Sequence, residues 1–420
     1  MSSVPRTADP PCIDCLDQES AAAHSATARQ VAFWLLAFVF AATMLGTTLP
    51  TPLYPFYQAQ WHFSSTLVTV IFAVYAAGVL AALLLAGRSS DQAGRRPVLT
   101  VAIGLSLLST VGFILAPDVA VLLVARVLSG VSAGLMTGTA TAALTELAPP
   151  AARRRASLVA TAVNMGGLGL GPLVAGLFAQ FVPQPTVAVF EAYLVLLAIA
   201  ALSLRYIPET VSPRRRPSFR LVRLAVPDQG RGAFLAAAVA AFSAFSLLGL
   251  FSALAPTFLG SVLHEHHPAV QGTVVFLIFG VGTLTQLVVA RRPSRRVMVI
   301  GLAVLLVALA LITTALSQAA LALFLVGTVV AGVGVGGVFL GSLATANRLA
   351  PSDRRGQTIA TFFAACYCGL IVPVIGVGVA SAFIGDFSAI VAFSVLIAAL
   401  CLLALAGIQR TRSGRAPSSS

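Results

Sequence analysis

The sequence predicts an all-α membrane protein in which 12 transmembrane helices form two pseudo-symmetric six-helix bundles. Three observations lead to this prediction: the composition, the lengths of the apolar segments and the positions of the arginines. Of the 420 residues, 58% are hydrophobic and 9% are charged, which lies far outside the composition of soluble domains. The composition therefore excludes an ordinary soluble protein.

The apolar segments have the length of membrane-spanning helices. A helix rises about 1.5 Å per residue, so about 20 mostly apolar residues cross the hydrocarbon core. The segments do not alternate in polarity as barrel strands do, which leaves the helix as the spanning structure. The expected spans are approximately residues 31–53, 66–87, 97–116, 119–144, 156–180, 186–206, 233–259, 270–290, 297–316, 319–345, 357–383 and 387–408.

The arginines predict the topology of these spans. All 26 cationic residues are arginines, and all but Arg126 lie in the two tails or in every second gap between spans. Basic loops stay on the cytoplasmic side of a membrane. We therefore expect a multi-pass protein of the cell membrane, a monomer in the lipid bilayer, with both termini in the cytoplasm. The net charge of +13 then reflects topology and attraction to anionic lipid, and no nucleic-acid partner is expected.

A long polar segment divides the spans six and six. It runs from Pro208 to Gly232 and contains six arginines and several prolines. The first 30 residues are polar and acidic and do not resemble a cleavable signal peptide. The expected organisation is a cytoplasmic tail (1–29), a first six-helix bundle (30–207), a cytoplasmic linker (208–232), a second six-helix bundle (233–408) and a cytoplasmic tail (409–420).

The two halves repeat each other weakly. Leu147-Ala148-Pro149 followed by Arg153-Arg154 recurs as Leu349-Ala350-Pro351 followed by Arg354-Arg355. The offset is about 200 residues, and both copies keep the same orientation in the membrane. Parallel halves related by an axis normal to the membrane are the repeat type of a large class of secondary transporters.

The loop between spans two and three carries the most specific motif. It reads Gly87-Arg88-Ser89-Ser90-Asp91-Gln92-Ala93-Gly94-Arg95-Arg96-Pro97. Glycines permit tight turns and close helix approach. Asp91, at the end of a helix, can accept hydrogen bonds from backbone amides or pair with Arg95 or Arg96. An ion pair of this kind, wedged between helices, would respond to their separation.

This loop resembles the signature loop of the major facilitator superfamily in placement and spacing. The span count, the central linker and the half-repeat extend the resemblance over the whole chain. The corresponding loop of the second half, Arg291 to Arg296, has arginines but no Asp or Gly, which suggests a latch on one side only. The alternative for the first loop is a merely solvated basic segment. The resemblance implies a conformational motif that latches the two bundles in the outward-open state, formed by Gly87, Arg88, Asp91, Gly94, Arg95 and Arg96.

Arg126 is the one cation in the interior of a predicted span. Gly130, Gly134 and Gly138 follow Arg126 at intervals of four residues, which places all four on nearly one helix face. Glycines at this spacing let a neighbouring helix approach closely. An arginine at the centre of the bilayer costs about 2.5–3.5 kcal/mol on insertion scales. We therefore expect Arg126 to face the bundle interior. The pattern resembles the span-four motif of the superfamily, whose arginine is implicated in coupling or substrate contact. The alternative is an arginine that reaches the outer interface.

Span five contains Gly167, Gly171-Pro172 and Gly176. A proline inside a helix removes one backbone hydrogen bond and bends it. The segment resembles the span-five motif of drug–proton antiporters and favours export over import. Ala175 and Leu158 depart from that motif. The alternative is that these glycines serve close packing alone.

Residues that could carry energy coupling are few. The chain contains no lysine, so a nucleotide-binding Gly-x-x-x-x-Gly-Lys loop cannot exist. Proton coupling usually requires a titratable group within the membrane, and among the acids only Glu191 lies within an apolar stretch. A Glu191–Arg126 pair is therefore one candidate. The polar span residues Asn164 and Gln286 complete the candidate substrate or coupling residues.

We expect no enzyme activity, cofactor or metal site. Cys12 and Cys15 form a CxxC in a tail expected to be cytoplasmic, where thiols stay reduced, and a zinc site would need two further ligands. The loop His264 to His267 is expected to be solvated.

These patterns predict a secondary active transporter that works by alternating access. Superfamily cavities are lined mainly by spans one, four, seven and ten, and span seven presents Phe242, Phe245 and Phe251. An apolar, aromatic cavity with one arginine suits a lipophilic substrate, and we expect export of small lipophilic or drug-like molecules in exchange for protons. The alternative within this class is a symporter or facilitator that imports a small organic acid or metabolite. A non-transporting receptor, or the permease subunit of an ATP-driven complex, is opposed by the half-repeat and the Asp91 loop.

Overall fold

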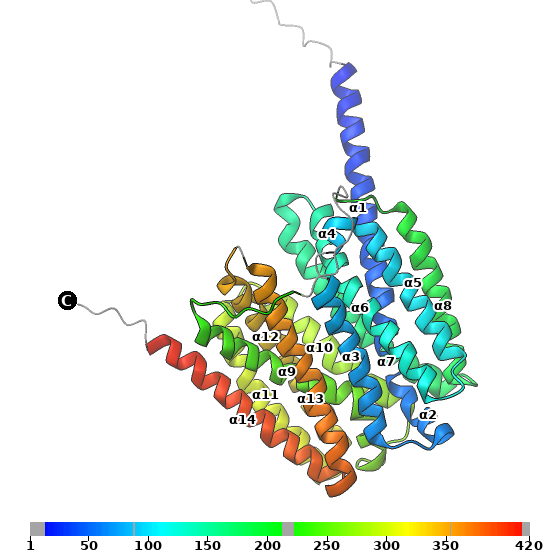
Figure 1. Ribbon diagram of the computed structural model, residues 1–420, viewed down its shortest axis with the longest axis vertical. Helices are drawn as coiled ribbons and strands as arrows, with labels where there is room; N and C mark the ends of the chain where they lie inside the picture. Colours follow the sequence, from blue (N-terminus) through cyan, green and yellow to red (C-terminus); the bar gives the residue numbers. More distant parts are fainter. Residues whose placement is uncertain (1–12, 87–88, 212–221, 353, 414–420) are drawn as a thin grey trace, which may run out of the picture.

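Long helices dominate the computed structural model, which describes residues 13–86, 89–211, 222–352 and 354–413. Within these residues, 12 helices are long and apolar enough to cross a membrane. Figure 1 shows them in two groups, with α1 to α8 on one side and α9 to α14 on the other. The predicted all-α fold with 12 spans is confirmed.

The first bundle contains six of the spanning helices. Short helices connect them: η1 (Thr51–Leu53), α2 (Tyr54–Trp61), α4 (Ser89–Ala93), η2 (Pro150–Ala152) and η3 (Leu204–Tyr206). The spanning helices are α1 (Ile13–Thr48), α3 (Ser65–Ala86), α5 (Arg95–Ile114), α6 (Val119–Leu147), α7 (Arg153–Phe181) and α8 (Pro185–Ser203).

The second bundle contains the other six helices and follows the linker. Two of its helices, α9 and α13, contain an internal proline. The spanning helices are α9 (Arg231–Ser261), α10 (Pro268–Val289), α11 (Ser294–Ser317), α12 (Leu321–Leu349), α13 (Arg355–Ile384) and α14 (Asp386–Ser413).

The first span differs from its prediction at both ends. Helix α1 begins at Ile13, so the expected boundary at residue 29 falls inside a continuous helix that projects from the bundle in Figure 1. At its other end α1 stops at Thr48, two residues before Pro50. The prolines there cannot continue a helix because they lack the backbone donor. A separate helix, α2, then turns aside and ends at His62 in the left-handed conformation.

The two ends of the molecule differ in charge. We call the end with α4, the α6–α7 turn and the Arg291–Arg296 segment the basic end, and the end with α2 and residues 262–267 the opposite end. With an even number of spans, α1 and α14 begin and finish at the basic end.

The two bundles touch closely toward the opposite end. Gly272 of α10 meets the carbonyl oxygen of Pro172 and the Cα of Gly176 on α7, so a side chain there would collide with the backbone. On the other side, the Thr66 hydroxyl of α3 donates to the Gly378 carbonyl of α13 at 2.7 Å. Glycine permits this approach because it has no Cβ.

Candidate functional site

A cavity of about 280 Å³ lies between the two bundles. The expected helices α1, α6, α9 and α12 contribute to its wall, and so do α3, α7, α10 and α13. Among the described residues that line it, none is acidic or basic. Seven are aromatic: Phe72, Tyr75, Phe245, Phe279, Phe339, Phe363 and Tyr367.

The cavity lies on the basic side of the closed contacts. On α13 its lining residues Phe363 and Tyr367 precede Gly378 by about three to four turns. On α7 the lining residue Asn164 precedes Pro172 by about two turns. The contacts through Gly272 and Gly378 therefore separate the cavity from the opposite end. Asn164, a predicted substrate residue, lies on the cavity wall, where its assigned role stays a prediction.

Only part of the predicted aromatic surface faces this cavity. Phe245 lines it. Phe251 is buried in the second bundle and stacks on Phe324 of α12 with ring centroids 5.9 Å apart, and the backbone of Phe242 packs against Gly369 of α13. Phe242 and Phe251 are nine positions apart on α9, which is about half a turn out of phase at 3.6 residues per turn, so one helix cannot present all three rings to one cavity.

Arg126 is buried inside the first bundle with a relative exposure of 1%. Its Nε donates to the Tyr54 hydroxyl at 2.9 Å, Nη1 donates to the Thr47 carbonyl at 2.7 Å, and Nη2 also contacts the Tyr54 hydroxyl. Arg126 lies in the interior, as predicted. The alternative, in which its side chain reaches the outer interface, is wrong. The alternative fails because α1 and α2 cover the guanidinium.

Aromatic rings surround the guanidinium group of Arg126. Its Cζ lies 5.5 Å from the ring centroids of both Tyr54 and Tyr75, and 5.7 Å from that of Phe113. Cation–π contacts of this kind contribute about 2 kcal/mol or more when the groups are desolvated. Tyr75 also lines the central cavity. Its side chain therefore contacts both the guanidinium of Arg126 and the cavity.

The predicted pair between Glu191 and Arg126 is wrong. Glu191 lies on an exposed face of α8, and in the described part of the chain no ion pair joins Arg126 to an acid. The sequence placed both residues at similar depth but could not fix the rotation of α8 about its axis. Tyr54 and Thr47 take the place of the acid.

Gln286 does not reach the cavity. Its side chain is buried in α10 at 3% exposure and is absent from the cavity wall. Its Oε1 has no hydrogen-bond partner among the described residues. A role for Gln286 in substrate binding or coupling therefore stays a prediction.

The glycines of α6 divide between two environments. Gly130 packs on the backbone of Tyr75 and Gly78, and Gly134 packs on Val79 and Ala82, so both admit helix α3. Gly138 has nothing within 4 Å of a built Cβ and lines the cavity. The predicted packing face therefore covers Gly130 and Gly134, whereas Gly138 widens the cavity.

The glycines of α7 serve both neighbours of that helix. Gly167 packs on Ala41 and Met44 of α1, and Gly171 packs on Leu45 and Thr48. Pro172 and Gly176 instead contact α10 of the second bundle, as described above. Helix α7 thus joins the two bundles, and the bearing of this motif on the direction of transport stays a prediction.

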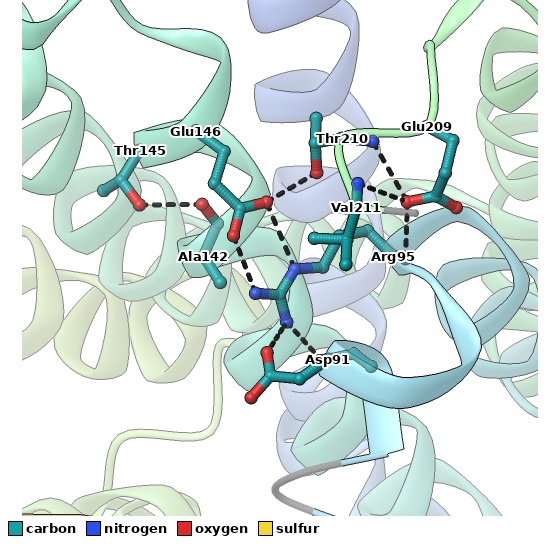
Figure 2. A network of polar contacts seen from close by, with 9 residues as sticks. Asp91, Arg95, Ala142, Thr145, Glu146, Glu209, Thr210 and Val211 are labelled. Atoms are coloured by element: carbon teal, nitrogen blue, oxygen red, sulfur yellow. Dashed lines mark hydrogen bonds and ion pairs between the residues drawn. The ribbon is translucent and has the colours of Figure 1, made fainter. Parts of the chain in front are cut away.

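A second polar site lies at the basic end (Figure 2). Arg95 Nη1 lies 2.6 Å from Asp91 Oδ1, and Arg95 Nη2 and Nε donate to the two oxygens of Glu146 at 2.7 and 3.2 Å. Thr210 donates its hydroxyl to Glu146 Oε2 at 2.5 Å. A bidentate arginine–carboxylate pair fixes geometry as well as charge. We call Asp91, Arg95, Glu146, Glu209 and Thr210 the Arg95 network.

Glu209 caps the start of α5 within this network. Its two carboxylate oxygens accept from the backbone amides of Arg95 and Arg96 at 2.8 and 3.0 Å. Negative charge at a helix N-terminus is favourable because the first amides are unpaired. Gly94 has φ +99°, and a Cβ there would lie 2.7 Å from Glu209 Oε2. The Gly94 of the motif is therefore required both by its backbone conformation and by the space that Glu209 occupies.

The predicted loop motif is thus assembled in part. Asp91 pairs with Arg95, as the sequence suggested, whereas Arg96 contributes its backbone amide to Glu209. Glu146 and Glu209 were missed. One available signal was that Glu146 directly precedes the repeated Leu-Ala-Pro segment, where the second copy has Arg348. Gly87 and Arg88 lie outside the described residues.

The loop at the opposite end holds a contact between Glu265 and His267. Glu265 Oε1 accepts from the backbone amide of His267 and lies 2.6 Å from its Nδ1. The His267 amide, and then its imidazole, hold the pKa of Glu265 below its ordinary value. In the described part of the chain, no group of three His, Cys, Asp or Glu side chains could hold a metal ion.

A cavity that is enclosed by two six-helix bundles and closed toward one end defines a membrane transport protein. The model of the Major Facilitator Superfamily matches residues 36–293, and the chain belongs to that superfamily. Membership in this superfamily indicates a transport protein.

Known relatives include proteins named for drug resistance. The chain is 33% identical over 223 residues to puromycin resistance protein pur8 of Streptomyces alboniger, covering 52% of this chain and 42% of pur8. It is 28% identical over 183 residues to multidrug resistance protein 2 of Bacillus subtilis, covering 43% and 45%. The chain thus matches less than half the length of these two relatives. The human organic anion transporter MFSD10 shares the fold, with a TM-score of 0.69 and 19% identity over 90% of this chain and 99% of that structure.

Proposed function

We propose that this chain is a secondary active transporter that exports small lipophilic or drug-like molecules from the cell by alternating access, in exchange for protons. The observation that carries the proposal is the aromatic cavity between the bundles, which is closed toward the opposite end and bounded by Tyr75 of the Arg126 cluster. The names of pur8 and multidrug resistance protein 2 support export.

The arginines support an orientation in which the basic end faces the cytoplasm, since basic loops resist translocation. In that orientation, we infer that the contacts at Gly272 and Gly378 belong to the state that receives substrate from the inside. Export then requires the contacts at Gly272 and Gly378 to separate and the basic end to close.

The cavity supports an uncharged or anionic substrate. The described lining residues offer aromatic rings and the polar side chains of Asn164, Thr137 and Thr161. None of these lining residues has a carboxylate that could pair with a cationic substrate. A buried charge close to the cavity is the guanidinium of Arg126, which lies against the Tyr75 ring. Proton exchange rests on the resemblance to the exporter group, since none of these lining residues is an acid.

One observation favours the importer of a small organic acid. In the described structure, Arg126 is a buried cation without an acidic partner, and its five N–H donors are only partly used by Tyr54 and Thr47. An anionic group reaching it would gain a charge-assisted hydrogen bond in a desolvated site.

Everted membrane vesicles test the direction and the energy source together. We expect accumulation of neutral and anionic lipophilic fluorescent dyes that depends on a proton gradient, with cationic dyes transported more slowly. Vesicles made without the protein provide the background. Accumulation of a labelled organic acid in right-side-out vesicles, with no dye transport in everted ones, would replace export by import.

Arg126→Ala tests the cluster that borders the cavity. We expect the variant to insert and express like the wild type yet lose transport, because it removes the buried positive charge that lies against the Tyr75 ring. Arg126→His should retain partial function at or below pH ~6.5, where imidazole is charged. Tyr75→Phe, which keeps the ring and its cation–π contact, is the matched control and should transport. Wild-type transport by Arg126→Ala would remove Arg126 from the mechanism.

A further inference from the structure

A groove of about 790 Å³ lies at the basic end, between α1 and the turn that joins α6 to α7. It shares no lining residue with the central cavity. Its position, beside the start of the apolar part of α1, corresponds to the headgroup region of the membrane leaflet on the basic side.

Three arginines line this groove. Arg29 comes from α1, and Arg153 and Arg155 come from the first turn of α7. All three are exposed, and none of their guanidinium groups has a hydrogen bond or ion pair to another described residue. Arg154, between the last two, points elsewhere and donates to the Ala290 carbonyl at 3.1 Å. The groove therefore gathers positive charge that the rest of the described chain does not neutralise.

The single acid at the groove does not balance this charge. Glu146 lines it, but both of its carboxylate oxygens already accept hydrogen bonds from Arg95, and one also accepts from Thr210. Its negative charge is thus paired within the Arg95 network. An anion that enters the groove meets three guanidinium groups that have no side-chain partner among the described residues.

Apart from Gln30, the remaining described residues of the groove are apolar. Phe33, Trp34, Leu147 and Val159 line it, and Trp34 is 56% exposed. Tryptophan is enriched at membrane interfaces, where its ring lies at the level of the headgroups. A basic rim beside an apolar, aromatic wall matches one kind of ligand: a phosphate attached to hydrocarbon chains.

We propose that this groove is a binding site for an anionic phospholipid of the leaflet on the basic side. Arg29, Arg153 and Arg155 bind the phosphate and headgroup, since guanidinium forms paired hydrogen bonds with phosphate oxygens. The acyl chains lie along Trp34. Basic pockets between transmembrane helices recognise anionic headgroups by this charge complementarity.

Tryptophan fluorescence can test the site in the full-length protein. The chain has two tryptophans, Trp34 and Trp61, so Trp61→Phe leaves Trp34 as the only emitter. The variant is placed in phosphatidylcholine vesicles that contain a small fraction of brominated lipid, which quenches tryptophan on contact. Brominated phosphatidylglycerol should quench more strongly than brominated phosphatidylcholine. The apparent affinity for phosphatidylglycerol should be higher by about fivefold for each arginine that binds the headgroup.

Matched variants separate the groove from general surface charge. A triple variant should lose the preference, so that the ratio of the apparent affinities for phosphatidylglycerol and phosphatidylcholine falls close to one. Its substitutions are Arg29→Gln, Arg153→Gln and Arg155→Gln. Arg291→Gln with Arg292→Gln, which removes two exposed arginines from the same end, should leave the preference unchanged. Glycerol phosphate at millimolar concentration should not displace the lipid, because it lacks the chains.

Three results would overturn the proposal. Equal quenching by the two brominated lipids would show that the groove does not select anionic lipid. An equal loss in the groove variants and in the Arg291 and Arg292 control would assign the preference to the whole basic surface. Displacement by free glycerol phosphate would make the site one for a soluble anion.

Discussion

The basic ends of the two halves use the same arginines differently. In the first half, Arg95 is fixed by the carboxylates of Asp91 and Glu146. In the second half, the corresponding Arg295 donates to the backbone carbonyl of Ile408 at 3.3 Å, and Arg348 lies 3.5 Å from the Ser294 hydroxyl. Among the described residues, Arg95 of the first half therefore belongs to an ion-pair network, whereas Arg295 and Arg348 of the second half contact neutral groups.

The repeat explains this difference. At the offset that aligns Arg95 with Arg295, Asp91 corresponds to Arg291, and at the offset of the Leu-Ala-Pro segments, Glu146 corresponds to Arg348. Both acids of the first half are replaced by arginines, so the network cannot be repeated. Helix packing needs only small and apolar residues, which both halves retain. The repeat therefore preserves the fold and leaves the charged network to the first half.

Arg95→Ala should produce the largest loss of stability among the variants of the two halves. It leaves Glu146 and Asp91 without their cation, and we expect a loss of about 2–3 kcal/mol in the free energy of unfolding, less than for a fully buried pair because water reaches both acids. Arg295→Ala, which loses a single contact to a carbonyl, should cost less than about 1 kcal/mol. Thermal unfolding in detergent measures both, and equal losses would contradict the asymmetry.

Gly94→Ala separates backbone strain from the Glu209 cap. Gly94 and Gly385 have similar conformations, with φ of +99° and +79°, so alanine is strained at both. Only Gly94 is close to a carboxylate; Gly385 has nothing within 4 Å. The Gly94 variant should lose about 1 kcal/mol more than Gly385→Ala, the typical value of a helix cap. The same thermal unfolding serves as the readout, and identical losses would mean that Glu209 contributes nothing to α5.

Glu146→Gln removes the charge of Glu146 at nearly constant side-chain shape. The amide can keep a hydrogen bond to Arg95, so we expect a loss of about 1 kcal/mol and a reduced rate of dye transport in everted vesicles. Arg348→Gln, at the corresponding position of the second half, should transport like the wild type. A transport defect in Arg348→Gln as large as that in Glu146→Gln would show that both halves contribute.

Asp91→Asn should have the smallest effect on stability. The Asp91 side chain is 59% exposed, and exposed pairs contribute about 0–1 kcal/mol. We nevertheless expect a shift in the conformational balance and slower transport, because the motif resembles a latch. Reaction of introduced cysteines from each side of the membrane reports the balance. Unchanged accessibility together with wild-type transport would exclude the latch.

The fold was predictable because its signals are long and local. Each span carries about 20 apolar residues, and the arginines mark alternate loops, so neither depends on knowing which helices touch. The same reasoning missed α2, because the first span was read through Pro50 and Pro52 to residue 53. The prolines were visible in the sequence, but the turn they impose depends on packing against α7.

The sites were predictable only where their residues are neighbours in sequence. Asp91 and Arg95 are four residues apart on one short segment, and their pair was expected. The partners of Arg126 come from other helices, and no spacing in the sequence connects it to Tyr54 or Tyr75. Depth alone suggested Glu191, which the rotation of α8 turns outward. Helix rotation and inter-helix distance are the properties that the sequence does not encode locally.

We propose that the Arg95 network of the first half controls the opening of the basic end, as its resemblance to the superfamily latch implies. Ser157 and Ser352 are exposed residues of the first and second bundle at that end. Once the five native cysteines are replaced, spin labels at these two positions report the distance between the bundles by double electron–electron resonance. We predict that Arg95→Ala shifts the distance distribution toward longer separations, whereas Arg295→Ala leaves the wild-type distribution. Identical distributions for wild type and Arg95→Ala, or equal shifts in both variants, would contradict the claim.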